Sequence, residues 1–125
     1  MICMTKFIDA NIFIRRFNDP KVKEFTNQLN RDEHCTSVLV LAETYHKLKK
    51  YNVENTFGFF RTIMGAVEIL DVTQSDFFLA LTSNLDININ DKIHIATMKR
   101  NSISTIISFD KDFEKEKTIL REEPG

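Results

Sequence analysis

An acidic residue interrupts the first apolar stretch of the sequence. Asp9 lies in KFIDANIF, with Phe7 and Ile8 before it and an apolar run at 12–14 soon after it. A carboxylate buried alone in apolar surroundings is costly, so it needs a partner or its pKa must rise. The first question that the sequence raises is therefore which partner stabilises Asp9.

Three other acids stand where the expected elements can bring them close to Asp9. Asp110 ends the strand-like stretch STIISFD, Asp91 lies in the first turn of an expected helix, and Glu43 lies inside the helix after HCTS. In open parallel sheets, ligands bind beyond the carboxyl ends of the strands. The four acids form no local motif, but they are compatible with one edge of such a sheet.

Taken singly, three of these acids have ordinary explanations. Asp91 suits the positive end of a helix dipole, Glu43 suits a solvated helix surface, and Asp110 suits a turn. Asp9 has no such explanation because both of its flanks are apolar. The four together are more informative than any one of them.

A divalent cation is the partner that four converging carboxylates require. Without it the acids would repel one another and their pKa values would rise. Mg²⁺ and Mn²⁺ prefer oxygen ligands, and a bound ion lowers the pKa of water and neutralises charge on a phosphodiester. We therefore expect an Mg²⁺ or Mn²⁺ site with these ligands: Asp9, Glu43, Asp91 and Asp110.

The apolar pattern predicts strands that alternate with helices. Strands are expected at about 5–9, 34–37, 66–72, 104–110 and 118–120, and helices at 12–17, 21–30, 38–51, 53–65, 73–85 and 88–102. Ser37 and Asn90 are the expected caps of two of the helices. This alternation predicts a three-layer α/β/α sandwich with a mostly parallel central sheet.

Length and composition indicate one ordinary domain. The 125 residues suit a single core, which we place at 1–121, followed by a polar tail at 122–125. No apolar run spans a bilayer and the N-terminus lacks signal-peptide features, so we expect a cytoplasmic protein with no membrane association. A net charge of -1 argues against nucleic-acid binding by positive charge alone.

The cysteines and an aromatic cluster leave their interpretation open. Cys3 and Cys35 have neither disulfide-framework nor zinc-site spacing and are expected to be buried thiols. The cluster Phe57, Phe59, Phe60, Ile63 and Met64 is expected in the core, with a dimer or partner surface as the alternative.

Four segments of the chain resemble the PIN-domain family, most closely its VapC-type toxin ribonucleases. In chain order they are FIDANIF, TSVLVLAETYHKL, NDKIHIATMKRN and IISFDKDF. The resemblance begins at Lys6, so the chain start could be Met1 or Met4. It implies a single-strand-specific endoribonuclease that depends on Mg²⁺ or Mn²⁺, a small antitoxin partner and a homodimer.

The resemblance also assigns roles to individual residues. It makes the same four acids the metal ligands, and it adds Asp112, which would help bind a second ion. Asn11 and Ser108 match positions that orient the acids by hydrogen bonds. One-metal and two-metal hydrolysis both remain open. The basic residues that would contact the RNA backbone are expected among Arg15, Arg16, Lys47 and Lys111.

Two other functions were weighed against the ribonuclease. The same fold could serve as an RNA-processing or scaffold protein with weak or no nuclease activity. The pairs Glu43-x-x-His46 and Asp91-x-x-His94 also resemble di-iron bundle motifs, but the strand patterns disfavour a helical bundle. His46 and His94 are expected to flank the acidic site or the surface, and His34 to lie at a strand edge.

Overall fold

The first strand, β1 (Lys6–Ile8), lies at the centre of the sheet. In the computed structural model, which describes residues 5–125, β1 pairs with β2 (His34–Ser37) on one side and β4 (Thr105–Ile107) on the other. β3 (Glu68–Leu70) and β5 (Leu120–Glu122) complete the order β3-β2-β1-β4-β5. All pairings are parallel, so the carboxyl ends of the strands meet at one edge.

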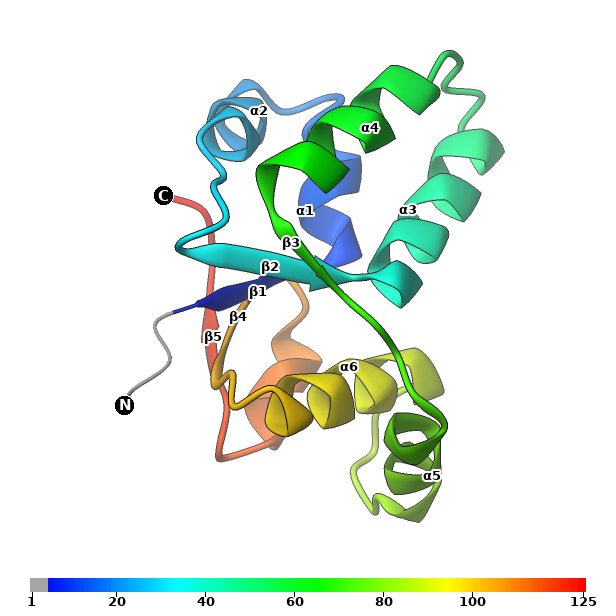
Figure 1. The fold of residues 1–125 in the computed structure, drawn as a ribbon, viewed down its shortest axis with the longest axis vertical. Coiled ribbons are helices and arrows are strands. Elements are labelled where there is room, and N and C mark those ends of the chain that lie inside the picture. The colour runs from blue at the N-terminus through cyan, green and yellow to red at the C-terminus, as the bar shows by residue number, and fades with distance from the viewer. Residues whose placement is uncertain (1–4) are drawn as a thin grey trace.

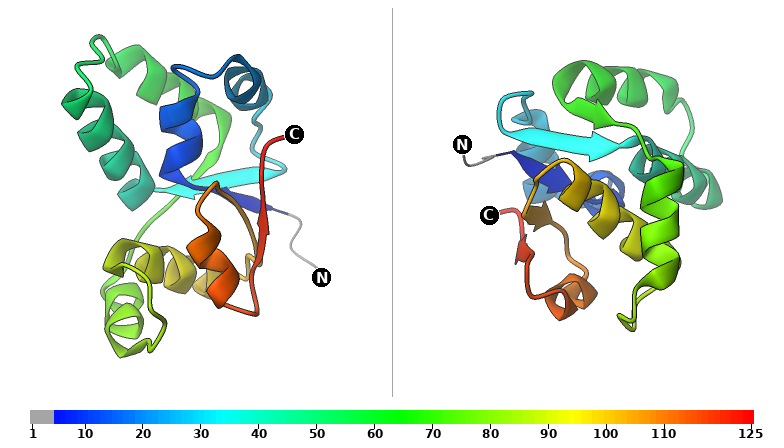
Figure 2. Two further views of the ribbon diagram at one scale, coloured as in Figure 1. Left: turned by 180° about the vertical axis from the view of Figure 1, so that it is seen from behind. Right: turned by 60° about the horizontal axis from the view of Figure 1, so that its bottom comes forward.

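Helices cover both faces of the sheet. Figures 1 and 2 show one group of helices on one face and a second group on the other. The first group is α1 (Ala10–Arg15), α2 (Pro20–Asn27), α3 (Val38–Lys50) and α4 (Phe57–Ala66), and the second is α5 (Gln74–Thr82), α6 (Ile89–Arg100) and the 3-10 helix η1 (Lys111–Lys115). The predicted three-layer α/β/α sandwich is confirmed, and a parallel sheet excludes the di-iron bundle.

Successive residues of β1 supply the core on both faces of the sheet. Phe7 and Ile8 are fully buried, and because side chains alternate along a strand they point to opposite faces. The Phe7 ring lies 5.7 Å from the ring of His94 on α6. A strand covered on both faces can be apolar throughout, which explains why Asp9 follows directly on buried residues.

The starts of α1 and α4 and the cap of α6 differ from the prediction for local reasons. α1 begins at Ala10, not at residue 12, because Asp9 caps it. α4 begins at Phe57, not near residue 53, because Asn55 has a φ value of 58°, which no right-handed helix contains. α6 is capped by Asn88, not Asn90, and the Asn88 side chain accepts a hydrogen bond from the Asp91 amide at 2.9 Å. The predicted cap of α3 is confirmed, because Ser37 Oγ accepts from the Val40 amide.

The last strand lies two residues beyond its predicted place. Glu122, expected to open the polar tail, instead ends β5, and Lys6 of β1 forms an ion pair with it at 2.8 Å. The proposed single-domain boundary remains a prediction. No helix within residues 5–125 is long and apolar enough to cross a membrane.

The aromatic cluster on α4 divides between core and surface. Ile63 is buried, and Phe59 and Phe60 are half-buried. Phe57 and Met64 remain 77% and 48% exposed, so the core interpretation holds for part of the cluster only.

The two predicted buried thiols fare differently. Cys35 is buried as expected. Cys3 lies outside the described residues, as do both candidate start sites, Met1 and Met4.

An ion pair between buried Asp76 and exposed Arg100 fixes α5 against α6. The Asp76 carboxylate accepts hydrogen bonds from Arg100 Nε at 2.8 Å and Nη2 at 3.0 Å, and from Thr97 Oγ1 and the Thr73 amide at 3.0 Å each. Burial alone would raise the pKa of Asp76, but the hydrogen bonds from Arg100, Thr73 and Thr97 outweigh it and lower the pKa below 3.8. This pair holds α6, the helix that carries Asp91.

Replacing Asp76 should destabilise the fold in a pH-dependent way. Asp76→Asn removes the charged acceptor of the hydrogen bonds from Arg100, Thr97 and the Thr73 amide, so we expect a lower free energy of unfolding at pH 7, measured by urea denaturation. The folded pKa is below the unfolded one, so the contribution is complete above the unfolded pKa and disappears as the pH falls through the folded pKa. The matched control is Asp32→Asn on an exposed loop, and equal stability of the two variants would contradict the role of the pair.

Candidate active site

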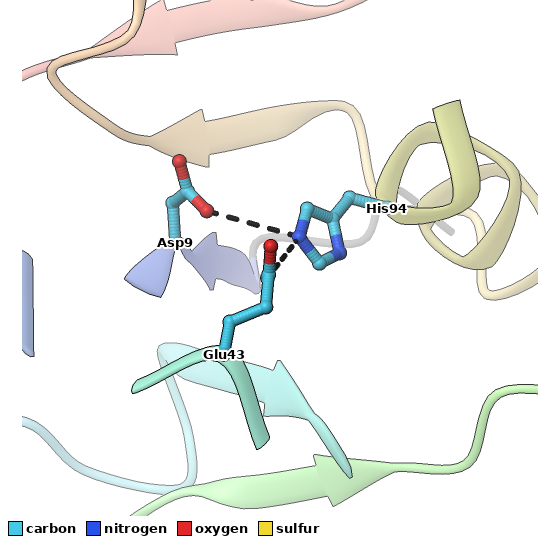
Figure 3. A group of neighbouring side chains, drawn as sticks. All are labelled: Asp9, Glu43 and His94. Carbon is cyan, nitrogen blue, oxygen red and sulfur yellow. Dashed lines mark hydrogen bonds and ion pairs between the residues drawn. The ribbon is translucent and has the colours of Figure 1, made fainter. Parts of the chain in front are cut away.

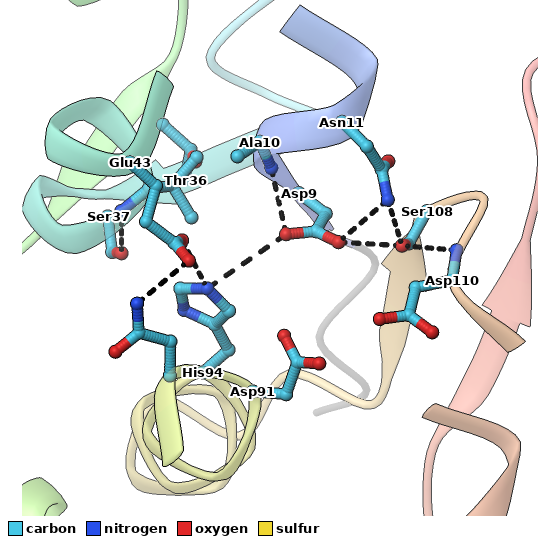
Figure 4. A network of polar contacts seen from close by, with 12 residues as sticks. Asp9, Ala10, Asn11, Thr36, Ser37, Glu43, Asp91, His94, Ser108 and Asp110 are labelled. Carbon is cyan, nitrogen blue, oxygen red and sulfur yellow. Dashed lines mark hydrogen bonds and ion pairs between the residues drawn. The ribbon is translucent and has the colours of Figure 1, made fainter. Parts of the chain in front are cut away.

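The Asp9 carboxylate lies at the carboxyl end of β1 and accepts hydrogen bonds from three neighbours. Its Oδ1 caps α1 by accepting from the Ala10 amide at 2.8 Å. Its Oδ2 accepts from Ser108 Oγ at 2.7 Å and from Asn11 Nδ2 at 3.2 Å (Figure 4). Asp9 is therefore held in one orientation by the start of α1 and by the end of β4.

Glu43 reaches the same place from α3. Ser37 ends β2 and caps α3, so the helix starts at the same edge of the sheet as Asp9. The Glu43 carboxylate contacts His94 Nε2 at 2.7 Å through Oε1, and its Oε2 accepts from Asn90 Nδ2 at 3.1 Å. His94 Nε2 is also 3.9 Å from Asp9 Oδ1, which makes a compact group of Asp9, Glu43 and His94 (Figure 3).

A second group lies beside the first. Asp91 at the start of α6, Asp110 after β4 and Asp112 in η1 each offer an oxygen, and these oxygens lie within 4.8 Å of one another. In Figure 4 the Asp91 carboxylate points toward Asp9, and the Asp110 carboxylate points to the side of Asp91. The structure thus brings all five predicted acids to one edge of the sheet, and their role as metal ligands remains a prediction.

The acids perturb one another because they are buried. Burial, and then the charge of Asp9 and the side chain of Asp110, raises the pKa of Asp91 to about 7, although the charge of His94 opposes this. Burial also raises the pKa of Asp9, although His94, Ser108 and the Ala10 amide oppose it. Burial alone would lower the pKa of His94, but Glu43 and Asp9 together raise it. The cluster is thus short of positive charge.

Ser108 links the acids to the rest of the sheet. Its hydroxyl donates to Asp9 and accepts from Asn11 Nδ2 at 3.1 Å and from the Asp110 amide at 3.0 Å. Its backbone is bound to β5, because the Ser108 amide donates to the Glu122 carbonyl and Arg121 Nη1 donates to the Ser108 carbonyl, at 2.9 Å each. Both predicted supporting residues, Asn11 and Ser108, therefore contact Asp9.

Two residues that were not predicted as metal ligands or as their supports contact the acids, namely Asn90 and His94, which was expected to flank the acidic site or the surface. His94 is fully buried in the cluster, whereas His46 on α3 is exposed and His34 is half-buried in β2. The spacing Asp91-x-x-His94 places both side chains on one helix face, so a signal for His94 existed. Asn90 was expected to cap α6, and the helix starts two residues earlier, which frees its amide to bind Glu43.

The donor set fits a divalent cation. It consists mainly of carboxylate oxygens, the ligands that Mg²⁺ and Mn²⁺ sites use, and one imidazole nitrogen, which transition metals accept more readily than Mg²⁺. Within residues 5–125, no Lys or Arg forms an ion pair with Asp9, Glu43, Asp91 or Asp110. A dication would relieve the mutual repulsion that the raised pKa values of Asp9 and Asp91 report.

Comparison with solved structures shows toxin–antitoxin proteins of the same fold. VapC20 from Mycobacterium tuberculosis, described as a sarcin-ricin loop cleaving toxin, is 20% identical, with a TM-score of 0.71 over 88% of this chain and 93% of that chain. A chain of DNA-bound VapBC from Salmonella typhimurium is 18% identical, with a TM-score of 0.72 over 98% of this chain and 100% of that chain. A chain of a toxin–antitoxin complex from Klebsiella pneumoniae is 19% identical, with a TM-score of 0.70 and coverages of 93% and 96%.

Sequence comparison identifies the family directly. None of the curated proteins matches the sequence. The family model described as PIN domain matches residues 6–117, which include β1 with Asp9, α3 with Glu43, α6 with Asp91 and the stretch from β4 through η1. Because the match covers most of the sequence and agrees with the observed sheet order and acid cluster, the chain belongs to the PIN domain family.

Proposed function

We propose that this protein is a metal-dependent endoribonuclease that hydrolyses phosphodiester bonds in single-stranded RNA. The observation that carries the proposal is the gathering of Asp9, Glu43, Asp91 and Asp110 at the carboxyl edge of the sheet, with no Lys or Arg ion pair to neutralise them in residues 5–125. Membership of the PIN domain family supports it. A hydrolase that needs Mg²⁺ or Mn²⁺ uses such a site to act on a phosphate ester.

We assign the side chains of the cluster two roles, ion binding and the positioning of the ligands. Asp9, Glu43, Asp91, Asp110 and Asp112 would hold one or two ions. A bound ion lowers the pKa of an attacking water and neutralises charge on the phosphate. Ser108 and Asn11 fix the Asp9 carboxylate, and Asn90 and His94 fix that of Glu43. This preorganisation keeps the ligand oxygens in place before substrate arrives.

We also propose that the protein is the toxin of a VapBC-type pair, with a small antitoxin as its partner, and that it forms a homodimer. The VapBC and toxin–antitoxin assemblies among the similar structures support an antitoxin. A run of exposed apolar side chains on α5 supports a protein partner: Phe77, Phe78, Leu79 and Leu81. A cytoplasmic location follows from this function, because the RNA substrate lies there.

Replacing Asp9 should abolish metal-dependent cleavage. Asn keeps the ability to cap α1 but removes the charged ligand, so Asp9→Asn should cut RNA at least about 100-fold more slowly in Mg²⁺ or Mn²⁺. The measurement is cleavage of a panel of single-stranded RNAs by the full-length protein.

Asp19→Asn is the matched control, because Asp19 caps α2 away from the cluster. Its activity should equal that of the wild type. Equal cleavage by Asp9→Asn and wild type would refute the metal-acid mechanism. A wild type that binds metal but cuts no RNA would favour the scaffold alternative.

Removing the Ser108 hydroxyl should weaken metal binding without removing a ligand. Ser108→Ala deprives Asp9 of its shortest hydrogen bond, so the dissociation constant for Mn²⁺, measured by calorimetry, should rise about 10- to 100-fold. Ser104→Ala, at an exposed site just before β4, should leave it unchanged. Unchanged affinity in Ser108→Ala would mean that Asp9 needs no such support.

Mn²⁺ should bind more tightly than Mg²⁺. His94 places an imidazole nitrogen beside the carboxylates, and Mg²⁺ prefers oxygen ligands and water while transition metals accept nitrogen. In calorimetric titrations, His94→Gln should weaken Mn²⁺ binding more than Mg²⁺ binding, and the stoichiometry reports whether one ion or two are bound. The exposed His46→Gln is the control. Equal losses for the two ions would reduce His94 to a hydrogen-bond partner of Glu43.

A further inference from the structure

A groove opens between α1 and α3 next to the acid cluster. Its volume is about 540 Å³, within the usual range of small-ligand pockets. Asn11 is one of the residues that line it, and the Asn11 amide contacts both Asp9 and Ser108. α1 and α3 run side by side over the same face of the sheet in Figures 1 and 2. The groove therefore adjoins the proposed site of cleavage through Asn11.

The groove is cationic. Arg15 and Lys47 line it, and none of the described residues that line it is acidic. The Arg15 guanidinium lies 3.8 Å from the centre of the Phe109 ring, which holds it beside the site. The Lys47 ammonium makes no hydrogen bond or ion pair within residues 5–125, whereas Arg16 is bound to Thr26 and Asn27. Arg15 and Lys47 are thus the basic residues placed to meet phosphates.

The groove also presents aromatic rings to solvent. Tyr51, the C-cap of α3, is 61% exposed, and Phe17, just after α1, is 40% exposed. The Phe17 ring is supported by Phe59, with ring centres 5.1 Å apart and planes at 71°. Aromatic rings beside a basic groove are how proteins bind single strands, because unpaired bases stack on the rings while cations meet the backbone.

We propose that the α1–α3 groove holds a nucleotide adjacent to the scissile phosphate of a single-stranded RNA. Tyr51 and Phe17 stack on its base, and Lys47 and Arg15 bind its phosphates. The assignment rests on the proposed ribonuclease function and goes further, because it names positioning residues and explains a preference for unpaired RNA. The alternative occupant of the groove is a segment of a protein partner. The two basic side chains and the two exposed aromatic rings favour RNA instead.

Tyrosine fluorescence gives a direct test. The chain has no Trp and two Tyr, so Tyr45→Phe leaves Tyr51 as its only strong ultraviolet emitter. In the inactive Asp9→Asn background, a pool of random single-stranded RNA should quench the fluorescence of Tyr51. The RNA concentration at half-maximal quenching should equal the midpoint of binding that fluorescence anisotropy of labelled RNA reports. Binding without quenching would overturn the proposal. Equal quenching by poly-glutamate would also overturn it, because the groove would then recognise charge alone.

Substitutions test the same groove in the active enzyme. Tyr51→Ala should raise KM about 10-fold with little change in kcat, and Tyr51→Phe should restore it. Lys47→Ala should weaken RNA binding and reduce the salt dependence by about 0.7 in the log–log slope, the contribution of one phosphate contact to a single strand. Lys50→Ala, exposed on the same helix, is the control.

The two proposals fail in different ways. If the wild type cuts RNA and both the Tyr51→Ala and Lys47→Ala variants keep its KM, the groove assignment is wrong and the ribonuclease stands. If the wild type neither binds nor cuts RNA, both proposals fall together.

Discussion

Several carboxylates share a small volume at the end of a buried parallel sheet, and their mutual repulsion is the constraint on which the rest of the site depends. Asp9 and Asp91 are buried, and the pKa of each is raised. Charges that interact weakly in water interact strongly where solvent is excluded. Such an arrangement persists only if the surrounding groups hold the oxygens apart and a cation completes the balance.

Asp76 and Asp9 are both buried, but they differ in the charge of the groups that bind them. Asp76 is equally buried, but Arg100 satisfies it with two charged hydrogen bonds, and its pKa is lowered. The donors to Asp9 are an amide, a hydroxyl and a carboxamide, which orient its oxygens without cancelling its charge. The carboxylate of Asp76 is therefore neutralised within the protein, while that of Asp9 faces no Arg or Lys among the described residues. This difference is visible only in the partners, since the residue type is the same.

The sequence predicted the order of elements well because apolar spacing and strand composition are local properties. The convergence of Asp9 and Asp110 followed from one rule, that parallel strands end at one edge. Other features depended on contacts that no local pattern encodes. His94 lies in the cluster because α6 packs against β1. α4 begins later than predicted because Asn55 has a left-handed backbone conformation. Which face of α4 is buried is decided by neighbouring elements, so Phe57 and Ile63 in one apolar run have opposite environments.

The edge strand β5 supports the acid cluster through the backbone of Ser108. Arg121 and Glu122 bind the carbonyl and the amide of Ser108, the residue whose hydroxyl orients Asp9. In space, Ser108 bridges Asp9 and β5. In sequence, more than a hundred residues separate Asp9 from Glu122. The edge of the sheet that gathers the acids is thus bounded by β5. A distortion of this edge strand would reach the Asp9 carboxylate through Ser108, although β5 itself contributes no side chain to the acid cluster.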